Sequence, residues 1–419
     1  MNSVETQHKK LKESLEYLSE HSAFYKRLFK THNISISEIN TVKDLQKIPF
    51  TTKEDLQAYT NDFICVPKNK LIDYVTTSGT SGKPLSLALT NADLDRLALN
   101  EYNSFITAGV TNNDIIQLMT TIDRRFMAGM AYFLGARKLG AGIIRVGNGI
   151  PELQWNTIDE IKPTVIICVP SFILKLVEYA EANNIDFKNS SVKKVICIGE
   201  SIRNSDFTLN ALGKKITQKW NLALHSTYAS SEMATAFTEC HSFKGGHLQP
   251  ELIITEIVDD NGLPVNNGEA GELVITTLGV EGMPLLRFKT GDICISYNEA
   301  CKCGNNSLRL GPVLGRKKQM IKYKGTSLYP NALYDVLENI EAVVNYQVEV
   351  NTNELDTDDI IINIGINEKA GNKTLEIADT FRAKLRVVPK LNFLTPEKVK
   401  QLLFPKDNRK PLLFIDKRN

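Results

Sequence analysis

The segment "TTSGTSGKP", residues 76–84, gathers groups that can bind a polyanion. It combines two glycines with five hydroxyl side chains and ends in Lys83 and a proline. Glycine permits positive φ, proline lacks an N–H donor, and Ser and Thr compete with the backbone for hydrogen bonds, so neither a helix nor a strand is favoured. Backbone N–H groups, hydroxyls and one ammonium in so short a loop suit a phosphate chain. A surface turn is the alternative for this segment taken alone.

Three later segments also place polar side chains in short, turn-rich stretches. They are "STYASSEMA" (226–234), "PLLRFKTGDI" (284–293) and "LGRKKQMIKYKG" (314–325). Each has an ordinary structural alternative, because Ser-Glu can cap a helix, Thr-Gly-Asp is a common turn, and "GRKK" fits a solvated basic turn. The first loop also lacks the four-residue spacing before Gly-Lys of a Walker motif, which argues against a mononucleotide kinase.

In their order along the chain, these four segments resemble the motifs of the adenylate-forming enzymes. That superfamily includes acyl- and aryl-CoA ligases, luciferases and adenylation domains. "TTSGTSGKP" is similar to its phosphate loop, "YASSE" to Tyr-Gly-x-Thr-Glu, "FKTGD" to Tyr-x-Thr-Gly-Asp, and "GRKKQMIKYKG" to its hinge motif. The match runs from about residue 20 to the C-terminus. The chain length, the helical N-terminus and the "CKCG" segment resemble the phenylacetate-CoA ligase-like branch.

The resemblance implies that a carboxylic acid attacks ATP to give an acyl adenylate, which a thiol then attacks. It implies a magnesium ligand in Glu232, a bond from Ser231 to the α-phosphate, a ribose contact by Asp292 and another by Arg316. Ala229 departs from the usual glycine, which suggests a different local backbone and not a lost function. The remaining residues implied to bind ATP are Ser78, Gly79, Thr80, Ser81, Gly82 and Lys83 at the β- and γ-phosphates, and Gly199, Glu200, Ser201 and Tyr228 at adenine.

The resemblance also implies that a small C-terminal domain rotates between the two half-reactions. By motif position the hinge residue is Lys318, although a surface lysine is the simple alternative. Aligning "FIDKR" with the ending of the phenylacetate branch makes Lys410 the adenylation lysine, with Lys406 as second candidate.

Members with this short scaffold mostly activate aryl or arylacetic acids. The candidate acyl pocket consists of Met127, Gly129, Met130, Ala131, Tyr132, Ala234 and Thr235, although the same residues make an ordinary packed helix. Coenzyme A and the phosphopantetheine of a carrier protein offer the same thiol, and coenzyme A is the usual acceptor. A non-catalytic nucleotide-binding homologue is the alternative from another class. A homodimer is left open.

Cysteine and histidine residues in two polar, glycine-bearing segments suggest a metal site. Cys240 and His247 come from "ECHSFKGGHL", and Cys301 and Cys303 from "ACKCG". Three thiols and one imidazole are the ligand set of a closed structural zinc site. His241 competes for the fourth place, and free cysteines in turns are the alternative. The other four cysteines (Cys65, Cys168, Cys197 and Cys294) stand in apolar surroundings and are expected to be buried and reduced.

Composition excludes several classes of protein. The chain has 419 residues, a net charge of +2, 42% hydrophobic and 23% charged residues, which is typical of a globular protein and not of a nucleic-acid or anionic-membrane binder. The first residues lack the apolar core of a signal peptide, and no apolar run approaches the roughly 18 residues of a membrane span. We therefore expect a cytoplasmic protein without nucleic-acid or membrane partners.

The elements predict an α/β fold with two domains. Short β-branched runs in "DIIQLMTT", "AGIIRVG", "PTVIICVP" and "VKKVICIGES" alternate with helical segments, which indicates a parallel sheet with crossover helices. The run "LIDYV" is expected to end at the carboxyl edge of such a sheet, where ligands bind. We predict an N-terminal domain over 1–315, with a β-rich subdomain at about 240–312, and a mobile α+β domain over 316–419.

Overall fold

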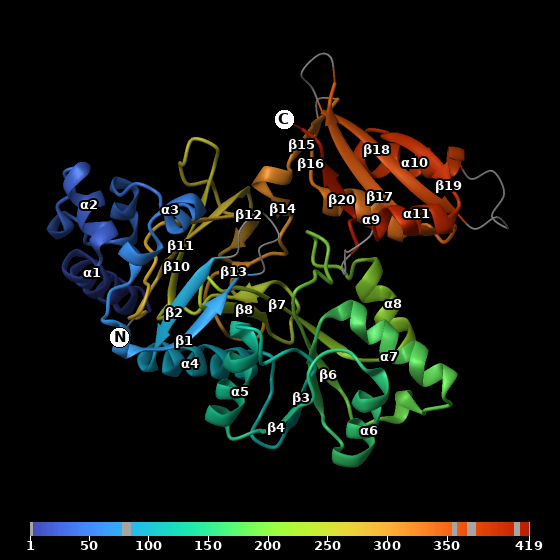
Figure 1. Cartoon of the computed structure of the whole chain (residues 1–419), viewed down its shortest axis with the longest axis horizontal. Helices are drawn as coiled ribbons and strands as arrows, with labels where there is room; N and C mark the ends of the chain where they lie inside the picture. The colour runs from blue at the N-terminus through green and yellow to red at the C-terminus, as the bar shows by residue number, and fades with distance from the viewer. Residues whose placement is uncertain are drawn as a thin grey trace. The chain divides into compact units, whose positions relative to one another are not determined.

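A computed structural model of the chain (Figure 1) describes residues 3–77, 85–324, 326–353, 358–366, 374–405 and 411–418. Contacts divide the chain into two compact units. The first unit consists of Met1–Thr290 and Cys294–Val313, and the second of Gly291–Ile293 and Leu314–Asn419. No helix among the described residues has both the length and the apolarity that a membrane crossing requires.

The centre of the first unit is a parallel sheet with the strand order β4-β3-β5-β6-β7. The strands are β3 (Ile115–Leu118), β4 (Gly142–Arg145), β5 (Val165–Cys168), β6 (Lys194–Cys197) and β7 (Ala223–Ser230). The helices between them are α5 (Met127–Leu139), α6 (Pro151–Ile161), α7 (Pro170–Ala182) and α8 (Ala211–Lys219), drawn in teal and green in Figure 1. The predicted alternation of buried strands and helices is present.

Alternate residues of these strands pack on opposite faces of the sheet. Ile166 and Cys168 of β5 belong to a cluster with residues of α6, α7 and α8. Val165 and Ile167 belong to another cluster, with residues of α5 and of α4 (Asn91–Thr107). Because side chains alternate along a strand, helices on both faces require the continuous apolar runs seen in the sequence.

Antiparallel strands extend the same sheet beyond β7. The order continues as β7-β8-β9-β13-β12-β11-β10. The added strands are β8 (Thr235–Glu239), β9 (Gly246–His247), β10 (Ile253–Val258), β11 (Ala270–Thr277), β12 (Phe288–Tyr297) and β13 (Arg309–Leu310). The β-rich region is therefore hydrogen-bonded into one sheet with the parallel strands.

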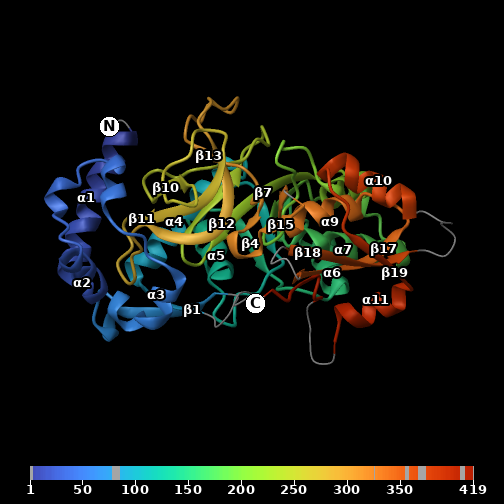
Figure 2. The same ribbon diagram turned by 90° about the horizontal axis from the view of Figure 1, so that it is seen from above.

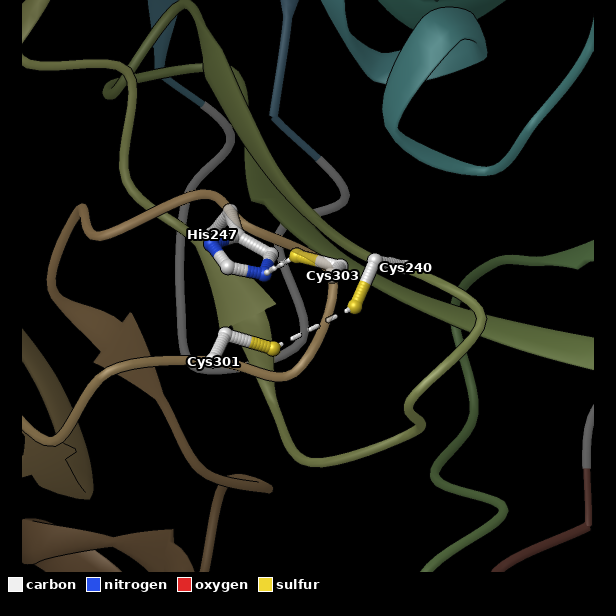
Figure 3. A group of neighbouring side chains, drawn as sticks. All are labelled: Cys240, His247, Cys301 and Cys303. Carbon is white, nitrogen blue, oxygen red and sulfur yellow. Dashed lines mark hydrogen bonds between the residues drawn. The ribbon is translucent and has the colours of Figure 1, made fainter.

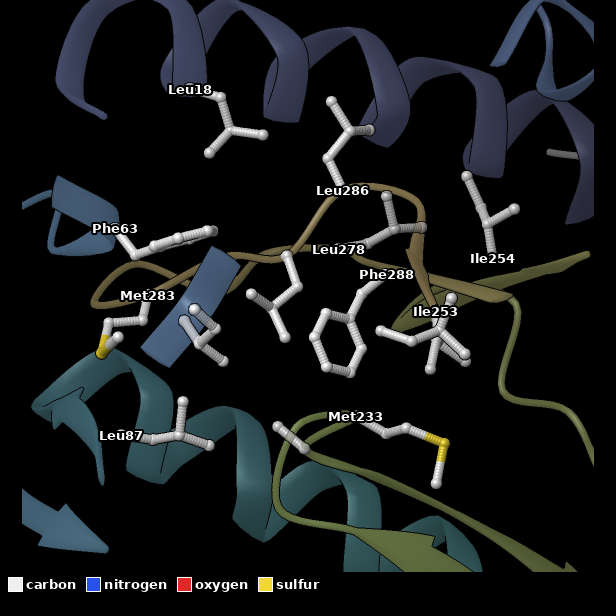
Figure 4. Close-up of a cluster of buried hydrophobic side chains, with 14 of the residues drawn as sticks. Leu18, Phe63, Leu87, Met233, Ile253, Ile254, Leu278, Met283, Leu286 and Phe288 are labelled. Atoms are coloured by element: carbon white, nitrogen blue, oxygen red, sulfur yellow. The ribbon is translucent and has the colours of Figure 1, made fainter. Parts of the chain in front are cut away.

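The N-terminal region is helical. It contains α1 (Ser3–His21), α2 (Ala23–Thr31) and α3 (Lys53–Ala58). Short 3-10 helices lie at Ile36–Glu38, Val42–Lys47, Thr60–Phe63 and Lys68–Lys70, and a further one lies later in the unit at Phe187–Asn189. Helix α3 begins after Thr52, because the Thr52 hydroxyl accepts a hydrogen bond from the Asp55 N–H. Leu18 of α1, Phe63, Met233 and Ile253 share one core, shown in Figure 4.

One strand prediction is wrong. The run "LIDYV" forms β1 (Leu71–Thr76), which pairs antiparallel with β2 (Ser86–Thr90) in a two-stranded sheet of their own. The predicted phosphate loop thus lies between the two strands of a hairpin and does not follow a strand of the parallel sheet. Exposed and half-buried residues alternate along β1 up to Val75, a pattern of a half-covered hairpin and not of a parallel strand buried on both faces.

The second unit holds a mixed sheet of strand order β19-β18-β17-β20, seen in orange and red in Figure 2. Its core has the order helix, strand, strand and helix, formed by α9 (Pro330–Glu338), β17 (Val343–Thr352), β18 (Asp358–Ile366) and α10 (Thr374–Leu385). The other elements are β14 (Gly315–Arg316), β15 (Ile321–Tyr323), β16 (Thr326–Leu328), β19 (Lys390–Leu394), α11 (Pro396–Leu403) and β20 (Phe414–Asp416).

Candidate active site and metal centre

The predicted phosphate-loop residues Ser78 to Lys83 lie outside the described residues, but both flanks are described. Thr77 N–H donates to Leu85 O over 3.0 Å, which closes the hairpin on either side of the loop. Arg125 holds the same hairpin, because its guanidinium donates to Tyr74 O at 3.2 Å and to Ser86 Oγ at 3.0 Å. Sequence reasoning missed Arg125, since only the fold brings the segment before α5 to β1 and β2.

The segment with Glu232 is the turn between β7 and β8. Ser231 and Glu232 are half-buried, whereas Met233 is fully buried in the core of Figure 4. Ala234 follows with a φ of 46°, an uncommon conformation for a residue with a Cβ. Tyr228 of β7 stacks on Phe237 of β8 with ring centroids 6.0 Å apart. The turn thus presents Glu232 between well-anchored neighbours.

The "GES" segment lies next to the Tyr228 segment. Cys197, the last residue of β6, pairs in register with Ser226 of β7, so Gly199 follows the end of β6 at the level of Tyr228, which is still within β7. Gly199 has a φ of 76°, which favours glycine. The Glu200 carboxylate accepts bonds from Ser171 N–H and Ser171 Oγ, both at 2.8 Å.

Asp292 and Arg316 are adjacent within the second unit. They oppose each other in the antiparallel pairing of β12 with β14, and Arg316 Nε lies 3.5 Å from Asp292 Oδ1. The Asp292 side chain is 14% exposed and that of Arg316 43%. Two groups predicted from separate motifs to contact ribose are therefore side by side.

Lys318 lies in the 3-10 turn Lys317–Gln319 directly after β14. Arg418 stabilises this segment, because its guanidinium donates to Met320 O at 2.7 Å and to Lys318 O at 3.3 Å. The "FIDKR" ending thus returns to the predicted hinge. Lys410 and Lys406 lie outside the described residues.

The predicted acyl-pocket residues fall into two packing groups. Met127 and Ala131 share the core of Met233 and Ala234, whereas Tyr132 packs on the other side of α5 with Phe105. Gly129 lies against the backbone of Thr121 and Ile122, where a Cβ would collide. Met130 is half-buried and Thr235 buried. Met127, Ala131 and Ala234 are thus brought together, and Tyr132 is not part of that group.

Cys240, His247, Cys301 and Cys303 form one compact group, shown in Figure 3. Their ligand atoms all lie within 4.8 Å of one another. Cys240 Sγ is 3.6 Å from Cys301 Sγ, and Cys303 Sγ is 3.4 Å from His247 Nε2. A tetrahedron with zinc–sulfur bonds of about 2.3 Å has sulfur–sulfur edges of about 3.8 Å, so the donor set fits zinc.

Groups around the four donors orient them. His247 Nδ1 lies 3.2 Å from Ser307 Oγ, which leaves Nε2 facing the thiols, as is usual for a metal-binding histidine. Backbone N–H groups of Ser242 and Asn305 donate to the sulfurs of Cys240 and Cys303 at 3.3 and 3.4 Å. His247 is 3% exposed whereas His241 is exposed, so the fold selects His247 as the neighbour of the thiols.

The pKa shifts of His247 and Cys301 suit a metal, whereas that of Cys240 favours a thiol whose proton a metal would have to displace. Burial, and then the charge of Arg309, lower the pKa of His247 to about 4, so its imidazole is neutral at pH 7. Burial raises the pKa of Cys240 to about 11. For Cys301 burial is outweighed by hydrogen bonds, first from the Cys303 backbone, and its pKa falls to about 7.

The four cysteines expected to be buried (Cys65, Cys168, Cys197 and Cys294) are buried.

Comparison with known proteins identifies the class. The model of the family "AMP-binding enzyme" matches residues 13–282, and the chain belongs to this family. It is 31% identical to phenylacetate-coenzyme A ligase of Thermus thermophilus over 351 residues, 82% of this chain and 77% of that protein. It is 27% identical to the Escherichia coli K12 protein of the same name, over 84% of this chain and 79% of that one. The predicted AMP-forming ligase of the phenylacetate-CoA ligase-like branch is confirmed.

A solved structure supports the fold. The crystal structure of 2-hydroxyisobutyryl-CoA ligase in the postadenylation state matches with a TM-score of 0.82 and 22% identity, over 98% of this chain and 88% of that one. The predicted α/β fold class is thereby confirmed.

Proposed function

We propose that this protein activates a carboxylic acid of the aryl or arylacetic class with ATP and transfers the acyl group to the thiol of coenzyme A. A carboxylate oxygen attacks the α-phosphorus of ATP, the bond from that phosphorus to pyrophosphate breaks, and an acyl adenylate forms. The thiol sulfur then attacks the acyl carbon, its proton is lost, and AMP leaves. The proposal is carried by the 31% identity to phenylacetate-coenzyme A ligase over 82% of the chain.

Each described motif residue has a task in this proposal. Tyr228 and the segment Gly199–Ser201 hold the adenine, and Asp292 accepts bonds from the ribose hydroxyls while Arg316 contacts the ribose. Ser231 donates to the α-phosphate, and Glu232 holds Mg²⁺. The half-buried position of Glu232 supports this role, and the buried Met233 anchors the backbone next to it. When bound, Mg²⁺ neutralises charge on the phosphate oxygens.

The phosphate loop and the C-terminal lysine complete the charge at the phosphates. Lys83 and the donors of Ser78 to Gly82 bind the β- and γ-phosphates, and Lys410, or Lys406 in its place, approaches the α-phosphate during adenylation. Lys318 is the hinge between the predicted domains 1–315 and 316–419, and turning there exposes the acyl adenylate to the thiol.

We further propose that Cys240, His247, Cys301 and Cys303 hold one zinc ion with a structural role. The neutral buried imidazole, the sulfur separation of 3.6 Å and the surrounding N–H donors support it. Four protein ligands would leave no open position for a substrate, which distinguishes structural from catalytic zinc sites. The ion would fasten the end of β8 to the segment after β12.

One assay tests the proposed function. Pyrophosphate release is measured over a panel of aryl, arylacetic and aliphatic acids, with and without coenzyme A. We expect release that requires an acid and Mg²⁺, is strongest with an aryl or arylacetic acid, and gives an acyl-CoA product when coenzyme A is present. A product formed only on a phosphopantetheine carrier protein would favour carrier loading. A chain that binds ATP but releases no pyrophosphate with any acid would be a non-catalytic homologue.

A further inference from the structure

Arg96, on helix α4, is a buried cation whose bonds all go to neutral oxygen atoms. Only 7% of the surface of this residue is exposed to solvent. Nε donates to Leu278 O at 2.7 Å, Nη1 to Ala234 O at 2.5 Å, and Nη2 to Leu252 O at 2.6 Å and Thr235 Oγ1 at 3.0 Å. Burial lowers the pKa of Arg96 to about 10, so the guanidinium is charged at neutral pH.

One of these four acceptors, Ala234 O, belongs to the turn that presents Glu232, and another, Thr235 Oγ1, belongs to the first residue of β8 directly after that turn. Ala234 and Thr235 are the second and third residues after Glu232, and Ala234 has a φ of 46°. A residue with a Cβ keeps such a backbone only where its surroundings enforce it. The charge-assisted bond to Ala234 O and the burial of Met233 both act on this turn.

Neighbouring side chains of α4 fix the frame in which Arg96 works. Asp93, one turn earlier, accepts bonds from Glu281 N–H at 2.7 Å and Gly282 N–H at 2.9 Å. Asn100, one turn later, accepts a bond from Ala236 N–H at 2.9 Å. Helix α4 is therefore hydrogen-bonded to the chain just before β10, just after β11 and at the start of β8, and Arg96 lies between Asp93 and Asn100.

We propose that Arg96 is a positioning residue for adenylation: it holds the Ala234 backbone in its left-handed conformation and thereby aims Glu232 and the acyl-facing residues Ala234 and Thr235. This inference rests on the proposed function. The planar guanidinium reaches acceptors in three separate segments at once, which the single nitrogen of a lysine cannot reproduce. Loss of one or more bonds lets the turn relax and displaces Glu232.

The test compares two conservative substitutions of buried arginines. Arg96→Lys keeps the positive charge but loses the planar guanidinium, whose nitrogens bond several acceptors at once. Arg287→Lys is the matched control, because Arg287 is 2% exposed and bonds Glu256 and Ile48 O but has no bond to the Glu232 turn. Measured quantities are kcat and KM for acid-dependent pyrophosphate release, the thermal midpoint, and the affinity for MgATP from its thermal shift.

We expect Arg96→Lys to lower kcat by roughly 10- to 100-fold, the scale of a small misplacement of a reacting group, and to weaken MgATP binding. Arg287→Lys should keep kcat within about threefold at a comparable loss of thermal midpoint, since it leaves the turn in place. Adding Ala234→Gly to Arg96→Lys should restore about three- to tenfold, because glycine adopts positive φ without strain.

An Arg96→Lys variant with wild-type kcat, or one that loses no more kcat than Arg287→Lys, would overturn the positioning role. Failure of the proposed function looks different, since the wild-type protein would then release no pyrophosphate with any acid. In that case a crystal structure of Arg96→Lys decides. Ala234 kept at a φ near 46° with the turn unmoved overturns the proposal, and a relaxed turn supports it.

Discussion

The Cys/His group and the nucleotide-binding motifs are assembled in opposite ways. The four Cys/His donors lie within 4.8 Å of one another, and all come from the first unit. Each donor has its own supporting contact or close partner in the chain. The predicted nucleotide motifs lie in separate segments, with Glu232 in the first unit and Asp292 and Arg316 on paired strands of the second.

In the Cys/His group the chain itself supplies all four ligands of the proposed metal ion. The predicted nucleotide motifs, by contrast, supply separate groups that would come together around a bound substrate. A closed set of ligands contributes its binding free energy to folding, so its loss should be read in stability. An open set of donors aimed at charge that develops during a reaction contributes to rate, so its loss should be read in kcat. The predictions below test that division.

The largest effect is expected from Cys301→Ser combined with Cys303→Ser. Removing two of four ligands should reduce the zinc content of chelator-washed protein from about one per chain to near zero, and lower the thermal midpoint by about 10 °C or more. Metal analysis and thermal unfolding measure these outcomes. His241→Ala is the control, because His241 is exposed and outside the group. A metal-free wild type that is fully stable and active would rule out the zinc site.

The next largest effect is expected on the rate of adenylation, with no change in the stability of the fold. Glu232→Gln should slow adenylation by raising its activation free energy by roughly 2–4 kcal/mol, the scale of one preorganised electrostatic contact. The zinc content and the thermal midpoint should stay unchanged. Pyrophosphate release and thermal unfolding are measured together. Glu181→Gln, which removes one exposed ion pair with Lys219, should change neither quantity. Unchanged pyrophosphate release in Glu232→Gln would contradict its assignment.

The two lysines of the C-terminal part should separate the half-reactions. Lys410→Ala should lose adenylation but keep thioester formation from supplied acyl adenylate, because it removes charge at the α-phosphate alone. Lys318→Pro should keep adenylation and slow thioester formation about tenfold or more, because it restricts the backbone at the hinge. Each half-reaction is measured by itself. Equal losses of both half-reactions in both variants would mean that the domain does not rotate.

Patterns among neighbouring residues predicted much of the fold, but they did not predict which strands pair when those strands are far apart in the sequence. The buried parallel strands follow from neighbouring residues and were found. The pairing of β1 with β2 was not, because one short apolar run looks alike in a hairpin and in a sheet. The choice of His247 over His241 likewise depends on the pairing of β9 with β13, which buries His247.

The candidate site shows the same limit. Motif order was enough to nominate Glu232, Asp292 and Arg316, and the fold brings the last two within 3.5 Å. Arg96 was missed because the polar residues of "NADLDRLALNEYN" resemble a solvated helix face. Only the tertiary structure turns that face inward, where Asp93, Arg96 and Asn100 bond backbone groups of other segments.

Glu101 is a buried acidic residue outside both of these sites, and it affects stability through pH. Its Oε1 accepts a bond from Asn100 Nδ2 at 2.9 Å, while Oε2 is buried without a partner among the described residues. Burial raises the pKa of Glu101 to about 8 from 4.5, against the lowering effect of Asn100. The folded state therefore binds more protons than the unfolded state between pH 4.5 and 8, and stability from this group falls as pH rises through that range.

Glu101→Gln tests this with a neutral side chain of nearly the same shape. At pH 5 the variant and the wild type should be about equally stable, because the wild-type carboxyl is then protonated in the folded state. Towards pH 8.5 the variant should become the more stable by roughly 4 kcal/mol, because the shift of this pKa from 4.5 to about 8 corresponds to roughly 5 kcal/mol and most of it falls between these two pH values. Denaturant unfolding of both proteins at several pH values measures the difference. Two curves that stay parallel would mean that Glu101 is ionised in the fold, and that water or another group completes it.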